Sequence, residues 1–189
     1  DRRPFNRGAL KNLGFLYIRK KYPKTYKDKT LVFSDVDCVF WKKGILKWKT
    51  THGRIKHFYG TNPKKSTALG GLFSITAGDF ERLNGFPNYW AWGYEDNALW
   101  FRVKFKGINI DYSQFHGMGS KWIIVFWHGP NRDVAEVDSW KRYKPEMEKK
   151  HGYGLSHIKN IKQELLKITD RIFYLQNISF NVPEKIPKN

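Results

Sequence analysis

The sequence lacks several features that would define its class at once. It has one cysteine, Cys38, which excludes an internal disulfide framework and a zinc site built from several cysteines. No apolar run approaches the ~20 residues that a spanning helix needs, so we expect no membrane segment in this chain. Acidic residues are scarce: 17 Asp and Glu stand against 35 Lys and Arg, which leaves a net charge of +18. Aromatic residues, by contrast, make up 17% of the chain, which is not the composition of a disordered segment.

The length of 189 residues is enough for one domain with its own hydrophobic core. The chain begins at Asp1, with neither an initiator methionine nor a visible signal peptide. The single cysteine and the lack of a visible signal favour the cytoplasm, and the Golgi lumen is the alternative.

The basic excess leaves a nucleic-acid-binding module open as one interpretation, because cations meet phosphates and aromatic rings stack on bases. The basic residues are scattered along the chain, however, and most aromatic residues lie in apolar, strand-like runs. Scattered lysine is more typical of a solvated surface, so no nucleic acid is expected as a partner.

Apolar patterning predicts alternating helices and strands, which favours an α/β layered domain. Helical segments are expected over residues 6–22, 79–83, 95–106 and 138–149. Strands are expected over residues 30–34, 72–75, 108–110, 122–127 and 171–182, with a hairpin over 41–59. The first two of these strands are short apolar runs of the kind that forms a buried strand.

A pair of carboxylates follows the first predicted strand directly, in Asp35-Val36-Asp37. Side chains at positions i and i+2 of an extended segment point to the same side, so both carboxylates can face one divalent cation. Mn²⁺ and Mg²⁺ prefer such oxygen ligands, and the cation can bridge the phosphates of a nucleotide. The alternative is a surface Asp pair that opens a turn.

A second group of candidates lies in the tryptophan-rich loop and beyond it. Trp90 and Trp92 flank one residue and can lay an aromatic face on a sugar or a base. Glu95 and Asp96 then open a helix, where they are either favourable N-terminal charges or include a general base. His128 ends another predicted strand and is either a ligand of the same cation or a structural histidine.

Taken in order, these segments resemble the catalytic core of the β-1,4-galactosyltransferase family. The resemblance is carried by residues 5–15, 32–37, 70–75 and 84–96, by Gly154-Leu155-Ser156, and by the final strand. It implies a GT-A-type fold, a mixed sheet flanked by helices. It also implies an inverting, Mn²⁺-dependent transfer of a hexose or N-acetylhexosamine from a UDP-sugar donor to a hydroxyl of a glycan or glycoprotein acceptor.

The resemblance also implies roles for individual residues. Phe5 and Arg7 would contact the uridine nucleotide, and Asp35 would contact the donor ribose or sugar. The full donor-binding set would be Phe5, Arg7, Asp35, Val36, Gly70, Gly71 and Trp92, with Trp92 in a mobile loop over the donor. Asp37 and His128 would bind Mn²⁺. Asp96 would be the base that deprotonates the acceptor, with Glu95 beside it.

The chain departs from the family pattern in places. Ala68 stands where galactose-specific members carry Tyr, and this smaller residue leaves room for the acetamide of N-acetylgalactosamine. Val125 stands three residues before His128, at the position where the family typically has a methionine ligand. Without that ligand the metal site is weaker, or a water molecule completes it. Asn97 stands where the family continues with Asp, which leaves acceptor recognition open.

The first nucleotide-binding strand of a GT-A fold would precede Phe5, so residues 1–189 are expected to be a single catalytic domain without that strand. These departures leave a non-catalytic remnant that binds a sugar or nucleotide as the alternative.

Overall fold

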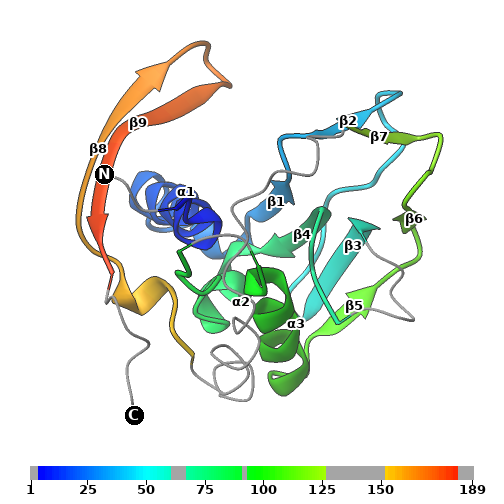
Figure 1. The fold of residues 1–189 in the computed structure, drawn as a ribbon, viewed down its shortest axis with the longest axis horizontal. Helices are drawn as coiled ribbons and strands as arrows, with labels where there is room; N and C mark the ends of the chain where they lie inside the picture. Colours follow the sequence, from blue (N-terminus) through cyan, green and yellow to red (C-terminus); the bar gives the residue numbers. More distant parts are fainter. Residues whose placement is uncertain (1–3, 61–66, 91–92, 127–151, 183–189) are drawn as a thin grey trace.

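The computed structural model describes residues 4–60, 67–90, 93–126 and 152–182 (Figure 1). Two predicted site residues, Trp92 and His128, and the helix expected over 138–149 lie outside the described residues.

The centre of the described chain is a mixed five-stranded sheet. Its strands run in the order β1 (Thr30–Ser34), β4 (Leu72–Thr76), β3 (Arg54–Gly60) and β5 (Asn109–Asp111), and β6 (His116–Gly117) also pairs with β3. β4 is antiparallel to both of its neighbours, whereas β5 and β6 run parallel to β3. The predicted α/β class with a mixed sheet is therefore confirmed.

The two strands that were both expected to be buried, β1 and β4, differ in how far they are buried. Every residue of β4 is buried, because this strand has a neighbour on each side and helices over it. β1 lies at the edge of the sheet, and 44% of Val32 is exposed. The expectation of a buried first strand was wrong, because an apolar run does not reveal whether its strand lies at an edge.

The hairpin expected over residues 41–59 does not form. β3 pairs with β4 and β5 instead, while β2 (Cys38–Phe40) forms a separate two-stranded sheet with β7 (Ile123–Val125). The segment between β2 and β3 packs an aromatic side chain on the sheet, with the rings of Trp48 and Phe58 centred 5.0 Å apart. Packing of this segment on the sheet replaces pairing of its backbone with β3.

Three α-helices, α1 (Arg7–Lys21), α2 (Ala77–Arg82) and α3 (Glu95–Phe105), agree with the predicted segments within two residues at each end. Asn6 begins α1 as its N-cap, because its side chain accepts a hydrogen bond from the Ala9 N–H at 2.9 Å. Two 3₁₀ turns, η1 (Tyr26–Asp28) and η2 (Leu155–His157), complete the helical elements of the described chain.

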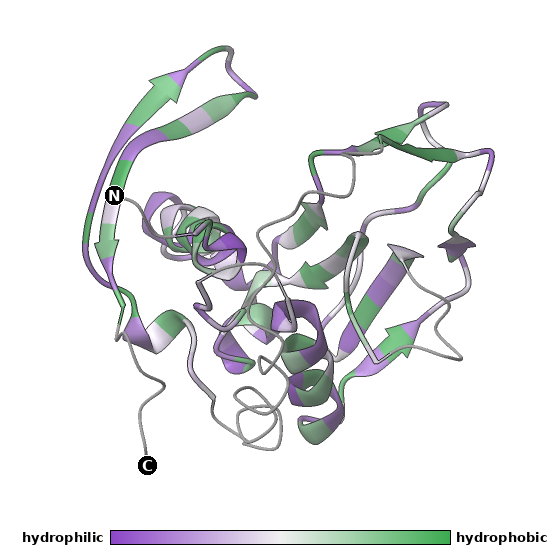
Figure 2. Cartoon of the chain, viewed as in Figure 1, coloured by the Kyte–Doolittle hydropathy of each residue, from purple (hydrophilic) through white to green (hydrophobic). Residues whose placement is uncertain are grey.

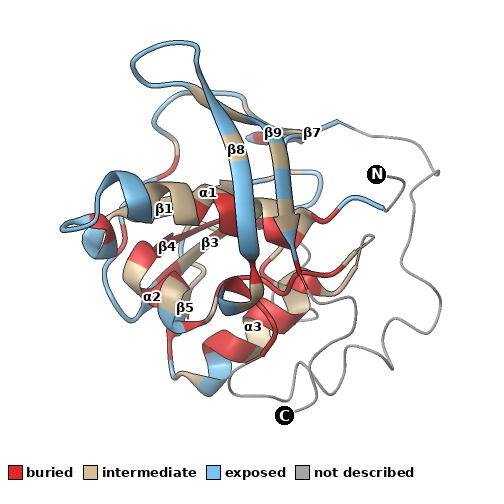
Figure 3. Cartoon of the chain, turned by 90° about the vertical axis from the view of Figure 1, so that its left-hand side faces the viewer, coloured by how far each residue is buried: buried red, intermediate tan, exposed pale blue. Residues whose placement is uncertain are grey.

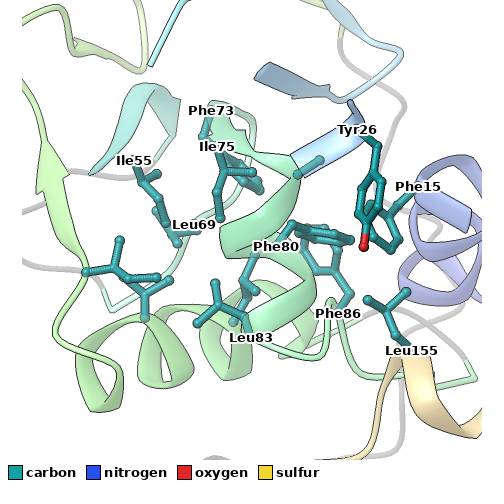
Figure 4. Close-up of a cluster of buried hydrophobic side chains, with 14 residues drawn as sticks. Phe15, Tyr26, Ile55, Leu69, Phe73, Ile75, Phe80, Leu83, Phe86 and Leu155 are labelled. Carbon is teal, nitrogen blue, oxygen red and sulfur yellow. The ribbon is translucent and has the colours of Figure 1, made fainter. Parts of the chain in front are cut away.

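The main core lies between the sheet and the helices (Figure 4). Phe15 of α1, Phe80 of α2 and Phe86 of the following loop meet there, with the Phe15 and Phe80 rings 5.3 Å apart. Because these aromatic side chains are at most 1% exposed, α1 and α2 are fixed against the sheet.

A long antiparallel hairpin of β8 (Lys159–Lys167) and β9 (Phe173–Asn181) runs beside α1 (Figures 1 and 3). Its residues are mostly exposed, and hydrophilic and hydrophobic positions are mixed along both strands (Figure 2). One end of the hairpin is anchored: the Phe180 ring stacks on Trp90, with the ring centroids 5.9 Å apart.

Buried asparagines join α1 to the loop that precedes α3. The Asn12 amide donates to the Phe86 carbonyl at 2.7 Å and to the Asn88 side chain at 2.9 Å. Asn88 in turn donates to the Gly154 carbonyl at 2.8 Å, and Asn6 donates to the Asn88 carbonyl at 3.1 Å. Such satisfied buried amides hold the start of α1 in a defined place relative to the tryptophan loop.

None of the helices within the described ranges has the length and apolar character needed to cross a membrane.

Candidate functional site

Charged side chains from three distant parts of the chain meet at the first turns of α1. The Arg7 guanidinium pairs with Asp35, just after β1, and with Glu95, at the start of α3. Lys11, one turn further along α1, places its Nζ 3.1 Å from the same Asp35 oxygen that Arg7 contacts. The site is therefore held by ion pairs between segments that are far apart in the sequence.

These charged groups shift one another's pKa values. Burial works to lower the pKa of Arg7, but the carboxylates of Glu95 and Asp35 raise it above its ordinary value. Burial works to raise the pKa of Asp35, but Lys11 and Arg7 hold it below its ordinary value. Burial and the charge of Arg7 together lower the pKa of Lys11, against the attraction of Asp35. At neutral pH Asp35 is therefore an ionised carboxylate beside the charged Arg7.

Asp96 stands in a different electrostatic environment from Asp35. Burial and the neighbouring charge of Glu95 raise its pKa to about 6, although Arg7 works in the opposite direction. Its carboxylate accepts a hydrogen bond from the Asn97 N–H at 2.8 Å. A carboxyl group with a pKa near 6 can accept a proton at neutral pH more readily than an ordinary aspartate can.

The two glycines of the predicted donor site lie between these carboxylates. A Cβ on Gly70 would come within 2.5 Å of the Asp96 Oδ2. A larger residue than glycine at position 70 would therefore displace the Asp96 carboxylate from its observed position. Gly71 has a φ of +71° and lies against the Tyr59 carbonyl, and its own carbonyl accepts the Asp35 N–H at 3.0 Å. The pair thus connects the Asp35 turn to the start of α3.

Asp37 lies beside this cluster, at the end of a tight turn that the Cys38 N–H closes on the Asp35 carbonyl at 3.1 Å. The Asp37 carbonyl accepts the Phe126 N–H at 3.0 Å, which joins the turn to the end of β7. Burial and the Asp37 carboxylate raise the pKa of the Cys38 thiol to about 12, so the thiol stays protonated and is a poor ligand.

The donor atoms near this turn fit a hard divalent cation. They are carboxylate oxygens, the ligand type that Mn²⁺ and Mg²⁺ take in proteins. Among the described residues, no three His, Cys, Asp or Glu side chains are grouped as a complete metal site. His128, the other expected ligand, follows Phe126 by two residues in the sequence and lies outside the described ranges.

The structure brings together six of the predicted site residues: Arg7, Asp35, Gly70, Gly71, Glu95 and Asp96. The Phe5 side chain is 69% exposed and that of Val36 fully exposed, so neither is built into the cluster. Trp92 lies outside the described residues, as His128 does.

Two residues of the site were missed by sequence reasoning. The first is Lys11, whose spacing of four from Arg7 on a helix was the available signal. The second is His57 of β3, whose Nε2 donates to the Gly70 carbonyl at 3.0 Å. Burial lowers the pKa of His57, so it is neutral at physiological pH. No local pattern connects His57 to Gly70.

Comparison with known proteins gives concordant matches. A family model described as the N-terminal domain of galactosyltransferase matches residues 51–121. β-1,4-Galactosyltransferase 5 of Danio rerio is 32% identical over 84% of this chain and 40% of its own length. β-1,4-Galactosyltransferase 6 of Mus musculus is 30% identical over 97% of this chain and 47% of its own length. The chain thus spans less than half the length of these relatives.

Solved structures agree at the level of the fold. The chain is similar to a Drosophila β-1,4-galactosyltransferase 7 mutant in complex with manganese, UDP-Gal and xylobiose. The TM-score is 0.64 at 22% identity, over 97% of this chain and 77% of that one. The catalytic domain of the same Drosophila enzyme with xylobiose gives a TM-score of 0.62 at 23% identity, with the same coverage of both chains. The expected GT-A-type fold is confirmed.

The prediction of a cytoplasmic location was wrong. The matched relatives are β-1,4-galactosyltransferases, which are Golgi-lumen enzymes. The error came from the cysteine count: one thiol is compatible with either compartment, because a chain with a large hydrophobic core needs no disulfide to fold.

Proposed function

The chain belongs to the β-1,4-galactosyltransferase family, and from this we propose that it is a UDP-sugar-dependent glycosyltransferase. It would transfer a hexose or an N-acetylhexosamine from the donor to a hydroxyl of a glycan or glycoprotein acceptor. The transfer would be a single displacement that inverts the anomeric centre. Mn²⁺ would be the metal cofactor.

The observation that carries this proposal is the position and protonation of Asp96. Its pKa of about 6 suits a general base, because it is largely ionised at neutral pH and still takes up a proton. The carboxylate lies at the N-terminus of α3 and against Gly70, beside the cluster of Arg7, Asp35 and Glu95. A base next to a group of fixed charges is the arrangement that a displacement by an acceptor hydroxyl requires.

The charged cluster would hold the donor. Arg7 can donate to donor oxygens, and the carboxylates of Asp35 and Glu95 can accept hydrogen bonds from sugar or ribose hydroxyls. Asp37 and His128 would hold the cation, which when bound supplies positive charge to the departing diphosphate. The ion pairs of Arg7 keep both carboxylates in place before the donor arrives, so little reorganisation is needed on binding.

The donor sugar would be galactose or N-acetylgalactosamine, with a slight preference for the second. Ala68 supports this preference, since it lies two residues before Gly70, in the segment that runs along the start of α3. That segment is tied to α3 by the Leu69 N–H, which donates to the Asp96 carbonyl at 3.2 Å. A small side chain here leaves space for an acetamide. Ala68→Tyr should therefore reduce use of UDP-N-acetylgalactosamine more than use of UDP-galactose.

The proposal is tested by measuring UDP release from both UDP-sugars, with Mn²⁺ and a panel of glycan acceptors, for the wild type and Asp96→Asn. We expect acceptor-dependent release by the wild type and a loss of about 10² to 10⁴-fold in Asp96→Asn, the range for removing a general base. Binding of UDP should be unchanged, because Asp96 is not assigned to the donor.

The alternative of a non-catalytic remnant makes the opposite prediction. Such a protein would bind UDP or the sugar without acceptor-dependent release, and Asp96→Asn would behave as the wild type. Asp28→Asn, which removes an exposed carboxylate from η1, is the matched control and should leave UDP release unaffected.

A further inference from the structure

Lys11 is a cation of the site, but it is not among the donor-binding residues proposed above. It lies one turn after Arg7 on α1, so both side chains project from the same face of the helix. Its side chain is only 15% exposed. The ammonium lies 3.1 Å from the Asp35 Oδ1 and 5.3 Å from the centre of the Phe86 ring.

Burying a lysine beside Arg7 has a cost in stability. Arg7 and Lys11 are like charges one turn apart, and both contact the same oxygen of Asp35. Such a pair destabilises a helix by itself, and burial of an ammonium adds to the cost. Arg7 shares its single positive charge between Asp35 and Glu95, so Lys11 also helps to balance these carboxylates, and its one hydrogen bond within the described residues, to Asp35, leaves the other N–H donors of the ammonium available to a ligand.

The ammonium also has unused hydrogen-bonding capacity. A lysine carries three N–H donors, and within the described part of the chain the structure gives Lys11 one hydrogen bond, to Asp35. The flexible stem lets the ammonium turn toward a neighbouring acceptor without movement of the helix, and a lysine binds phosphate as a compact point charge.

We propose that Lys11 is a donor-binding residue whose ammonium donates to an oxygen of the nucleotide sugar held beside Asp35. The inference rests on the proposed function and adds to it a contact on α1. The acceptor is either a phosphate oxygen or an oxygen of the sugar, and both would take a hydrogen bond from the same ammonium.

The experiment compares binding of UMP, UDP and UDP-galactose in the presence of Mn²⁺, measured by calorimetry. Lys11→Met removes the charge and keeps an unbranched side chain over Phe86. Lys20→Met, which removes an exposed charge from the same helix, is the matched control. We expect Lys11→Met to bind UDP-galactose about tenfold or more weakly, since a hydrogen bond from a charged group is lost.

The smallest ligand whose binding is weakened identifies the acceptor oxygen. A loss with UMP or UDP assigns Lys11 to a phosphate, and a loss only with UDP-galactose assigns it to the sugar. Lys20→Met should bind all three ligands as the wild type does. A thermal unfolding curve for Lys11→Met shows that the protein tested is folded.

Unchanged binding of all three ligands by a folded Lys11→Met would overturn this inference and leave the proposed function standing. Lys11 would then serve only to hold Asp35. Failure of the wild type to bind UDP and UDP-galactose would overturn both. The wild-type titration therefore separates the two failures.

Discussion

Replacing Asp96 with Asn should make the protein more stable at the same time as it removes the proposed base. The pKa of Asp96 in the folded chain is raised from 3.8 to about 6. The folded state therefore binds this proton more tightly than the unfolded state, and ionisation of Asp96 at neutral pH costs folding free energy. At 1.36 kcal/mol per unit, the cost is at most about 3 kcal/mol, and partial solvent contact of the carboxylate reduces it.

The direction of the pH dependence follows from the raised pKa. Well below pH 3.8 Asp96 is protonated in both states, so its favourable contribution to folding is complete. That contribution is lost as the pH rises through about 6. The free energy of unfolding of Asp96→Asn should therefore exceed that of the wild type by up to about 3 kcal/mol at pH 8, and by much less at pH 4.5.

Urea unfolding of both proteins at the two pH values measures this difference, and comparing the two pH values cancels the contacts that the substitution changes at every pH. Asp170→Asn, at an exposed carboxylate of the hairpin, is the control substitution. The kcat/KM of the wild type should fall below pH 6 for the same reason. An equal stability difference at pH 4.5 and pH 8 would refute the reasoning.

Three further predictions concern single residues. Gly8→Ala should lower the free energy of unfolding by about 1 to 3 kcal/mol, because the new Cβ would lie 2.0 Å from a backbone oxygen. Gly14→Ala, on the same helix, meets open space and should raise the free energy of unfolding by up to about 1 kcal/mol. Thermal unfolding compares the two, and equal effects would contradict the packing. Cys38, with a pKa of about 12, should react with iodoacetamide at pH 8 far more slowly in the folded chain than in urea; equal rates would show that its thiol is not protected. Asp37→Ala should abolish the increase in UDP affinity that Mn²⁺ produces in the wild type, as calorimetry would show, and an undiminished increase would remove Asp37 from the metal site.

Several elements could be predicted from the sequence because their signals are local. The apolar spacing of α1, its Asn6 cap and the following Pro23 define a helix without reference to the rest of the chain. The run of β4 has enough apolar residues to require burial on both faces. The order of the motifs along the chain likewise indicates the family, because that order is a property of the sequence itself.

The structure alone decided which strands pair and which lie at an edge. β1 and β4 have similar apolar runs, but only β4 is central, and the strands that the structure pairs with β3, namely β4, β5 and β6, all follow it in the chain. The hairpin predicted over 41–59 failed for this reason. Backbone pairing depends on which segments are brought together by packing, and a local alternation of side chains does not contain that information.

The same distinction holds for the site. The sequence by itself determined that carboxylates follow β1 and open α3, since a strand end and a helix start are local features. It could not show that Arg7 joins the two, because Asp35 and Glu95 lie 28 and 88 residues away from it. Nor could it show that Asp96 has a raised pKa while Asp35 has a lowered one, because burial and charged neighbours come from tertiary packing.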